Sequence, residues 1–202
     1  SARARAEVVR AADGVSAVWV ERCGRARWRW ARHVGRERAI LRDAGAVVAI
    51  SPMVAAELAE RYGVAATVVL NPLLCPEAAS PRDDVDLLWV GHGFARKGLD
   101  RALCVLAGLP GRHLTVVGRG ARAGAWRRRA AAQGVADRVT FVGPAEAAPY
   151  VAGARLLLHP ARYEPYGNVV AEAVRHGVAV VASATTGASC LLHADHVWEE
   201  GE

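Results

Sequence analysis

Short apolar runs alternate with amphipathic segments through the second half of this chain. Strands are predicted at residues 86–90, 113–118, 138–142, 155–159 and 178–182, and helices at 98–109, 121–134, 146–153 and 167–176. Alternation of this kind favours a parallel sheet with right-handed crossovers and helices packed on its faces. We therefore predict an α/β fold with a Rossmann-like, doubly wound parallel sheet over residues 84–202.

The first part of the chain carries a shorter pattern of the same kind. A strand is predicted at 46–50, a helix at 52–62 with Ser51 as its N-cap and Gly63 as its stop, and a strand at 67–70. Residues 73–83 are polar and contain proline, which is typical of a linker. These features indicate that a partial α/β domain over residues 1–72 precedes the Rossmann-like domain.

The strand–loop–helix–strand unit at residues 155–182 is the most informative segment for function. Its loop contains Glu164 and Gly167, and its helix contains Glu172. Parallel sheets bind ligands at the carboxyl ends of their strands, and the amides of a helix start suit a phosphate. Two carboxylates nearby can accept hydrogen bonds from hydroxyls, so the unit suits a phosphorylated, hydroxyl-rich ligand such as a nucleotide sugar. The alternative is that both acids only favour the helix dipole or lie on an exposed helix face.

A second strand-to-helix turn indicates the same chemistry. It follows the strand at 86–90 with Gly91, His92 and Gly93, and a few residues later it contains Lys97. The chain has 26 lysine and arginine residues, and Lys97 is the only lysine among them. A lysine is a compact charge that arginine does not replace at a crowded phosphate. Chance is the alternative explanation for a single residue.

The spacing of Glu164 and Glu172 resembles the E-x7-E signature of retaining GT-B glycosyltransferases of family 4. The preceding His159-Pro160-Ala161 and the following GVAVVA at 177–182 also match that family, and the likeness is strongest to its lipopolysaccharide-core glucosyltransferases. The likeness implies transfer of a hexose, namely glucose from UDP-glucose, to a glycan or lipopolysaccharide-core acceptor with retention of configuration. His92 is a departure, because many members have arginine there.

The resemblance assigns a donor-site role to nine residues. They are Glu164 at the catalytic position, where it would hold sugar hydroxyls; Arg96, Lys97, Gly167 and Asn168 at the donor diphosphate; Glu172 at the donor ribose; and Gly91, His92 and Gly93 in the donor loop. The family likeness further implies that no metal and no cofactor is required, because cationic side chains neutralise the diphosphate of the donor substrate.

Members of this family have two complete domains, with the acceptor mainly on the first. The resemblance therefore implies that residues 1–72 are the C-terminal part of a truncated acceptor-side domain, that 73–83 are a linker, and that the nucleotide-sugar-binding domain at 84–202 is truncated at its C-terminus. We expect such a fragment to bind a nucleotide sugar and to transfer sugar poorly.

A strongly basic segment lies between Arg22 and Arg42. It contains eight arginines and one acid, with Trp28 and Trp30 among them. Such a helix can lie on an anionic membrane surface, bind nucleic-acid phosphates, or simply expose a solvated basic face. The formal net charge of +6 and the pI near 9.7 fit an anionic partner of any kind.

Other classes of protein fit the sequence less well. No apolar run is long enough to cross a membrane, and the four cysteines and seven histidines lack metal-ligand spacing, so a reducing cytoplasm is the simplest setting, with a peripheral membrane position as an extension of it. A dinucleotide-binding dehydrogenase would need a third glycine where Arg96 stands. A basic nucleic-acid-binding module would explain the charge but leave Glu164 and Glu172 without a role.

Overall fold

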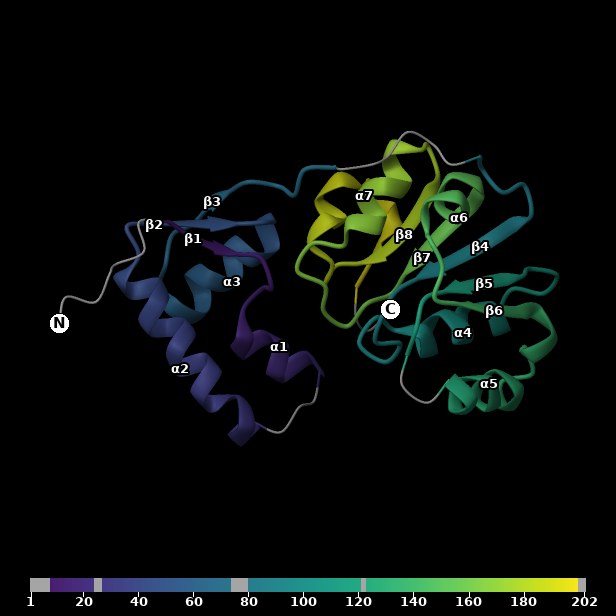
Figure 1. The fold of residues 1–202 in the computed structure, drawn as a ribbon, viewed down its shortest axis with the longest axis horizontal. Helices are drawn as coiled ribbons and strands as arrows, with labels where there is room; N and C mark the ends of the chain where they lie inside the picture. Colours follow the sequence, from purple (N-terminus) through teal and green to yellow (C-terminus); the bar gives the residue numbers. More distant parts are fainter. Residues whose placement is uncertain (1–7, 24–26, 74–79, 121–122, 200–202) are drawn as a thin grey trace. The chain divides into compact units, whose positions relative to one another are not determined.

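The computed structural model describes residues 8–23, 27–73, 80–120 and 123–199, and it divides into two compact units (Figure 1). Unit 1 comprises residues 1–72 together with 163–167 and 185–190. Unit 2 comprises residues 73–162, 168–184 and 191–202. Two short segments of the second half of the chain thus group with the first half.

Unit 2 is built around a parallel sheet of six strands. The strands are β4 (Val85–Val90), β5 (Leu114–Val117), β6 (Val139–Gly143), β7 (Ala154–His159), β8 (Ala179–Ser183) and β9 (Val197–Trp198). Their order is β6-β5-β4-β7-β8-β9, and every neighbouring pair is parallel. The chain starts in the centre at β4, builds outward to β6, and then returns to the centre at β7. This is the strand order of the Rossmann fold, so the predicted fold class is confirmed.

Helices cover both faces of this sheet (Figure 1). They are α4 (Leu99–Ala107), α5 (Ala123–Ala132), α6 (Ala148–Gly153) and α7 (Asn168–Arg175). Helices α4 and α5 lie on one face, and α6 and α7 lie on the other. All four were predicted, with boundaries one to two residues too wide at most ends. Strand β9 and the short 3-10 helices near the C-terminus were not predicted.

The main core of unit 2 fills the space between the sheet and the face carrying α4 and α5. Trp89 of β4 and Phe94 of the following turn pack edge to face, with 5.2 Å between ring centroids, and Leu103 and Leu106 of α4 are fully buried beside them. Full burial of one such side chain contributes about 1.5–3 kcal/mol to folding. The core therefore holds the end of β4 and the turn after it in a fixed position.

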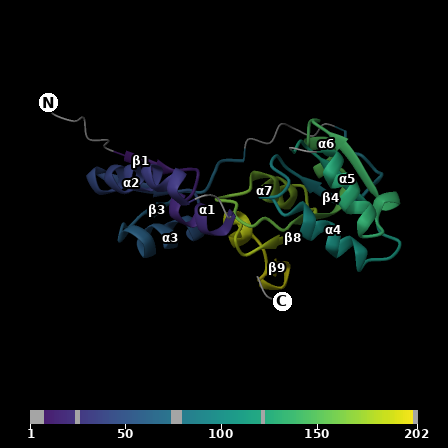
Figure 2. The same ribbon diagram turned by 90° about the horizontal axis from the view of Figure 1, so that it is seen from below.

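Unit 1 contains a parallel three-stranded sheet, ordered β1-β2-β3, and three helices, which Figure 2 shows from below. Its strands are β1 (Val8–Ala11), β2 (Ala46–Ala49) and β3 (Thr67–Val68), and its helices are α1 (Ser16–Cys23), α2 (Arg27–Asp43) and α3 (Pro52–Tyr62). The Ser51 hydroxyl accepts a hydrogen bond from the Val54 amide, and Gly63 ends α3 in the left-handed conformation, as predicted. Strand β1 and helix α1 were not predicted.

The basic segment forms helix α2, but part of it is outside the described residues. The side chains of Trp28 and Trp30 belong to that part, so their predicted role stays a prediction. Cys75 and most of the predicted linker also lie outside the described residues. Within the ranges that the structure describes, no helix has the length and apolar character needed to cross a bilayer.

Gly98 offers a direct test of the packing between the turn before α4 and the loop after β7. It has φ 69°, and a side chain there would overlap the carbonyl oxygen of Pro160. Gly134 has the same φ but open space around it. We expect Gly134→Ala to lower the free energy of unfolding by about 1–2 kcal/mol, because of the left-handed backbone alone. Gly98→Ala should lower the free energy of unfolding by clearly more, because its side chain also meets the Pro160 carbonyl oxygen. Equal losses in urea unfolding would contradict the close approach.

Candidate functional site

The centre of the six-stranded sheet is a topological switch point. Strands β4 and β7 are neighbours, but the chain leaves β4 toward β5 and leaves β7 toward β8, in opposite directions. The two loops that follow these strands therefore diverge, and such a switch point is where open α/β sheets bind ligands. The loop after β4 begins at Gly91 and the loop after β7 begins at Pro160, and both carry residues predicted to belong to the site.

Glycines let the segments at this switch point approach closely. A side chain at Gly91 would overlap the Lys97 Cδ atom, so the aliphatic part of Lys97 lies against the start of the turn. A side chain at Gly118, after β5, would overlap the Gly91 carbonyl oxygen. Replacing either glycine would push the backbone or Lys97 out of place, because only glycine leaves this space empty.

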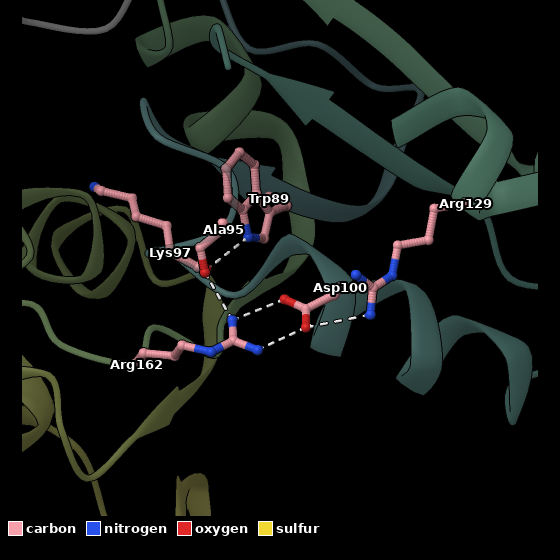
Figure 3. A network of polar contacts seen from close by, with 6 residues as sticks. All are labelled: Trp89, Ala95, Lys97, Asp100, Arg129 and Arg162. Carbon is pink, nitrogen blue, oxygen red and sulfur yellow. Dashed lines mark hydrogen bonds and ion pairs between the residues drawn. The ribbon is translucent and has the colours of Figure 1, made fainter. Parts of the chain in front are cut away.

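Hydrogen bonds to three successive carbonyls hold the turn that carries Arg96 and Lys97, and Figure 3 shows those at Ala95 and Lys97. The Trp89 indole donates to the Lys97 carbonyl at 3.2 Å. The Arg162 guanidinium donates to the Ala95 carbonyl at 2.7 Å, and the Arg162 amide donates to the Arg96 carbonyl at 2.9 Å. Because donors from β4 and from the loop after β7 bind all three, the backbone of the turn is fixed from two sides.

The Arg162 guanidinium is itself fixed by Asp100, near the start of α4. Its two terminal nitrogens bind the two Asp100 oxygens at 2.8 and 2.6 Å, and Arg129 of α5 lies 3.5 Å from the same carboxylate (Figure 3). Burial raises the pKa of Asp100, but the hydrogen bonds and charge of Arg162, with the charge of Arg129, hold it below its usual value. The Lys97 ammonium extends away from this network.

Glu172 lies on α7 and is half-buried. Burial raises the pKa of its carboxyl, and the charges of His176 and Lys97 oppose that rise. Lys97 and Glu172 are therefore close enough to interact electrostatically, so unit 2 brings together one residue predicted for a diphosphate and one predicted for a ribose. Asn168, the first residue of α7, has an exposed side chain.

Glu164 and Gly167 belong to the segment 163–167, which groups with unit 1. The Glu164 amide donates to the Thr185 carbonyl at 3.0 Å, and the Glu164 carbonyl accepts from the Gly187 amide at 2.8 Å. Its side chain is half-exposed. Gly167 has φ 91°, a backbone conformation that favours glycine, directly before α7 begins. The backbone of Glu164 is thus bound on both sides.

A small pocket lies at the carboxyl ends of β5 and β6. Its volume is about 190 Å³, and its lining includes Phe94, Arg119, Gly120, Arg127, Phe141 and Pro144. His92, which is exposed, accepts a hydrogen bond from the Arg119 amide at 3.4 Å and so ties the turn after β4 to the rim of this pocket. Gly93 is also exposed.

Several residues that shape this site were not predicted from the sequence. Arg162, Asp100 and Trp89 fix the turn, but each is far from Lys97 in sequence or looks like an ordinary core or helix residue. In the described ranges, no group of three or more histidine, cysteine, aspartate or glutamate side chains is placed to hold a metal ion. Cys104 and Cys190 are exposed free thiols.

Comparison with known proteins connects this geometry to a family. The family model of group 1 glycosyl transferases matches residues 84–198, more than half of the chain. The lipopolysaccharide glucosyltransferase WaaG of Escherichia coli (strain K12) is 40% identical over 107 residues, which are 50% of this chain and 28% of WaaG. The lipopolysaccharide core biosynthesis glycosyltransferase LpsE of Rhizobium meliloti (strain 1021) is 29% identical over 109 residues, 54% of this chain and 32% of LpsE.

Solved structures agree on the fold. The crystal structure of WaaG superimposes with a TM-score of 0.78 at 24% identity, covering 96% of this chain and 62% of that one. Anabaena HepE in complex with UDP-glucose gives 0.75 at 20% identity, covering 96% of this chain and 58% of that one. The chain thus spans about three-fifths of these structures, and its fold is that of GT-B glycosyltransferases. Together with the match over residues 84–198, this places the chain in the family of group 1 glycosyl transferases.

Proposed function

We propose that this protein is a retaining glycosyltransferase of family 4 that moves glucose from UDP-glucose to a saccharide acceptor of the lipopolysaccharide-core type. The observation that carries the proposal is the turn with Arg96 and Lys97, fixed on three carbonyls at the switch point, with Glu172 within electrostatic reach of Lys97. WaaG is a lipopolysaccharide glucosyltransferase, and HepE was solved with UDP-glucose, which supports this donor and this acceptor class.

The chemical demand of the reaction is to stabilise a diphosphate as it leaves the sugar. Arg96 and Lys97 supply two positive charges from a turn whose three successive carbonyls are hydrogen-bonded, so little reorganisation is needed when charge develops on the leaving oxygen. The amides of Gly167 and Asn168, at the start of α7, add hydrogen-bond donors and the positive end of the helix dipole. In this proposal these groups neutralise the diphosphate without a metal ion.

The remaining residues bind the uncharged parts of the donor. Glu172 accepts hydrogen bonds from the ribose hydroxyls, and Glu164 accepts them from hydroxyls of the sugar that is transferred. The donor loop of Gly91, His92 and Gly93 leads to the pocket beside Phe94 and Phe141, which suits the flat, partly apolar base. The acceptor then attacks from the face that the diphosphate leaves, which retains the configuration of the sugar.

We also propose that the protein works in the cytoplasm, at the inner surface of a membrane. Helix α2 exposes four described arginines, at positions 32, 36, 38 and 42, and Ile40 beside them is 53% exposed. A helix with exposed arginines and an exposed apolar side chain suits the interface of an anionic bilayer. A lipid-linked acceptor would be presented at that surface. Nucleic-acid phosphates are the alternative partner for these arginines.

Lys97 is the first residue to test. Lys97→Ala removes a charge-assisted hydrogen bond to the diphosphate and should weaken UDP binding by about 1.5–3 kcal/mol, roughly ten- to hundred-fold in Kd. Isothermal titration calorimetry with UDP measures the change. Arg128→Ala is the control, since Arg128 is an exposed cation on α5. Equal affinities in Lys97→Ala and the parent protein would exclude Lys97 from the site.

The ribose assignment predicts a ligand-specific and pH-dependent effect at Glu172. Glu172→Gln should weaken binding of UDP and leave binding of inorganic pyrophosphate unchanged, because pyrophosphate has no ribose. Since burial raises the pKa of Glu172, the parent protein should lose UDP affinity as pH falls through a value above 4.5, and Glu172→Gln should not show that loss. If the variant weakens both ligands alike, the effect is a general electrostatic one and the assignment is wrong.

The membrane proposal predicts different effects for two matched pairs of arginines. Arg32→Gln with Arg36→Gln on α2 should lower partition onto vesicles that contain anionic lipid by roughly thirty-fold, at about 1 kcal/mol for each arginine. Arg127→Gln with Arg128→Gln on α5 removes the same charge and should have little effect. Co-sedimentation with anionic and zwitterionic vesicles measures both. An equal loss from the two pairs would show that net charge matters and α2 does not.

A further inference from the structure

The hydroxyl of Tyr163 lies at the centre of a buried polar network in unit 1. Tyr163 is fully buried. Its hydroxyl accepts a hydrogen bond from the Val15 amide at 2.9 Å, directly before α1, and donates one to Glu57 Oε2 of α3 at 2.7 Å. The residue directly before Glu164 is therefore bound to two elements that lie more than a hundred residues away in the sequence.

The space for this hydroxyl depends on a glycine. Gly14 has φ 76°, and a side chain there would overlap the Tyr163 hydroxyl and lie 2.8 Å from Pro165 Cγ. The Ser51 hydroxyl donates to the Pro165 carbonyl at 2.8 Å, and the Ala188 amide donates to the Tyr166 carbonyl at 2.6 Å. With the two backbone hydrogen bonds of Glu164, every residue from Tyr163 to Tyr166 is tied to unit 1.

The hydrogen-bond network around Tyr163 includes a buried carboxylate oxygen that is left without a partner, which is not expected if the network only stabilises the fold. Glu57 is only 8% exposed, and its Oε1 atom has no hydrogen-bond partner among the described residues. Burial raises the pKa of Glu57, although the hydrogen bond from Tyr163 and the charges of Arg22 and Arg61 oppose the rise. A well-packed apolar pair often stabilises a protein as well as a buried polar pair does. What the polar pair adds is direction, because a hydrogen bond fixes where the tyrosine ring stands.

We propose that Tyr163 is a positioning residue, whose hydroxyl, held between Val15 and Glu57, fixes the backbone of the loop that carries Glu164 and so limits the orientations of its carboxylate. This inference rests on the proposed function, which gives Glu164 the hydroxyls of that sugar. Tyr163 itself touches no ligand. Its effect should therefore appear in the part of donor binding that depends on the sugar, and not in the part that depends on the nucleotide.

Calorimetry with two ligands separates these parts. UDP reports the diphosphate and ribose contacts, and UDP-glucose adds the sugar. Tyr163→Phe should weaken UDP-glucose binding by roughly three- to ten-fold, as for the loss of one hydrogen bond, and leave UDP binding unchanged. Tyr166→Phe is the matched control, because Tyr166 is a buried tyrosine of the same loop whose hydroxyl has no hydrogen bond in the described structure. It should bind both ligands like the parent protein.

Two variants at Glu57 keep the test valid if Tyr163→Phe folds poorly. Glu57→Gln retains an oxygen that accepts the tyrosine hydroxyl, so it should bind UDP-glucose like the parent protein. Glu57→Leu removes the acceptor at similar volume and should reproduce the loss seen with Tyr163→Phe. Equal UDP-glucose affinity in Glu57→Gln and Glu57→Leu would overturn the positioning role.

Glu164→Ala, which removes the accepting oxygens, distinguishes failure of this inference from failure of the proposed function. If Glu164→Ala weakens UDP-glucose binding but Tyr163→Phe does not, Tyr163 has no positioning role, and the role of Glu164 stands. If Glu164→Ala leaves UDP-glucose and UDP affinities unchanged, Glu164 does not hold the sugar, and both proposals are wrong. If Tyr163→Phe weakens UDP and UDP-glucose equally, the hydroxyl acts on the fold as a whole, which also overturns the inference.

Discussion

The ion pair between Arg162 and Asp100 is the interaction on which the candidate site depends. It is bidentate, and bidentate pairs fix direction as well as distance. Because one guanidinium nitrogen also binds the Ala95 carbonyl, the pair connects the start of α4, the turn before it and the loop after β7. Without it, the loop after β7 would hold the turn that carries Lys97 through the Arg162 amide alone.

The pair also sets the charge balance around the turn that carries Lys97. Arg162 is committed to Asp100, and Arg129 contributes to the same carboxylate, so the acid in the neighbourhood is already neutralised. The Lys97 ammonium extends away from Asp100, and the nearest predicted acid is Glu172, whose pKa is raised by burial. Under the proposed function, a negatively charged ligand would meet the positive charge of Lys97, whose ammonium does not face Asp100.

The sequence predicted the elements of this fold well where local chemistry decides them. Ser51 and Gly63 bound α3 because an N-cap hydroxyl and a left-handed glycine are local signals, and the strands of unit 2 follow from short apolar runs. Strand β1 was not predicted because Arg10 interrupts the apolar run of its four residues. Strand β9 was not predicted because its two residues are too few to show an alternating apolar pattern. The order of the strands in the sheet creates the switch point, and the spacing of apolar residues along the sequence does not specify that order.

The residues of the candidate site likewise divide into those that the sequence indicated and those that it did not. Lys97 and Glu172 carried a signal, the first as the sole lysine and the second through the family spacing, and the structure brings them within electrostatic reach. Arg162 and Tyr163 carried none, because their partners lie 62 and 106 residues away and arginine and tyrosine are unremarkable in a loop. Long-range hydrogen bonds of this kind become visible only in three dimensions.

Chemical-shift mapping with UDP tests the central claim most directly. UDP should perturb the amides of residues 91–98, around the turn, and of 168–172 at the start of α7, and it should leave the amides of α2 unaffected. Perturbation confined to α2, or no saturable change at millimolar UDP, would contradict a nucleotide site at the switch point between β4 and β7.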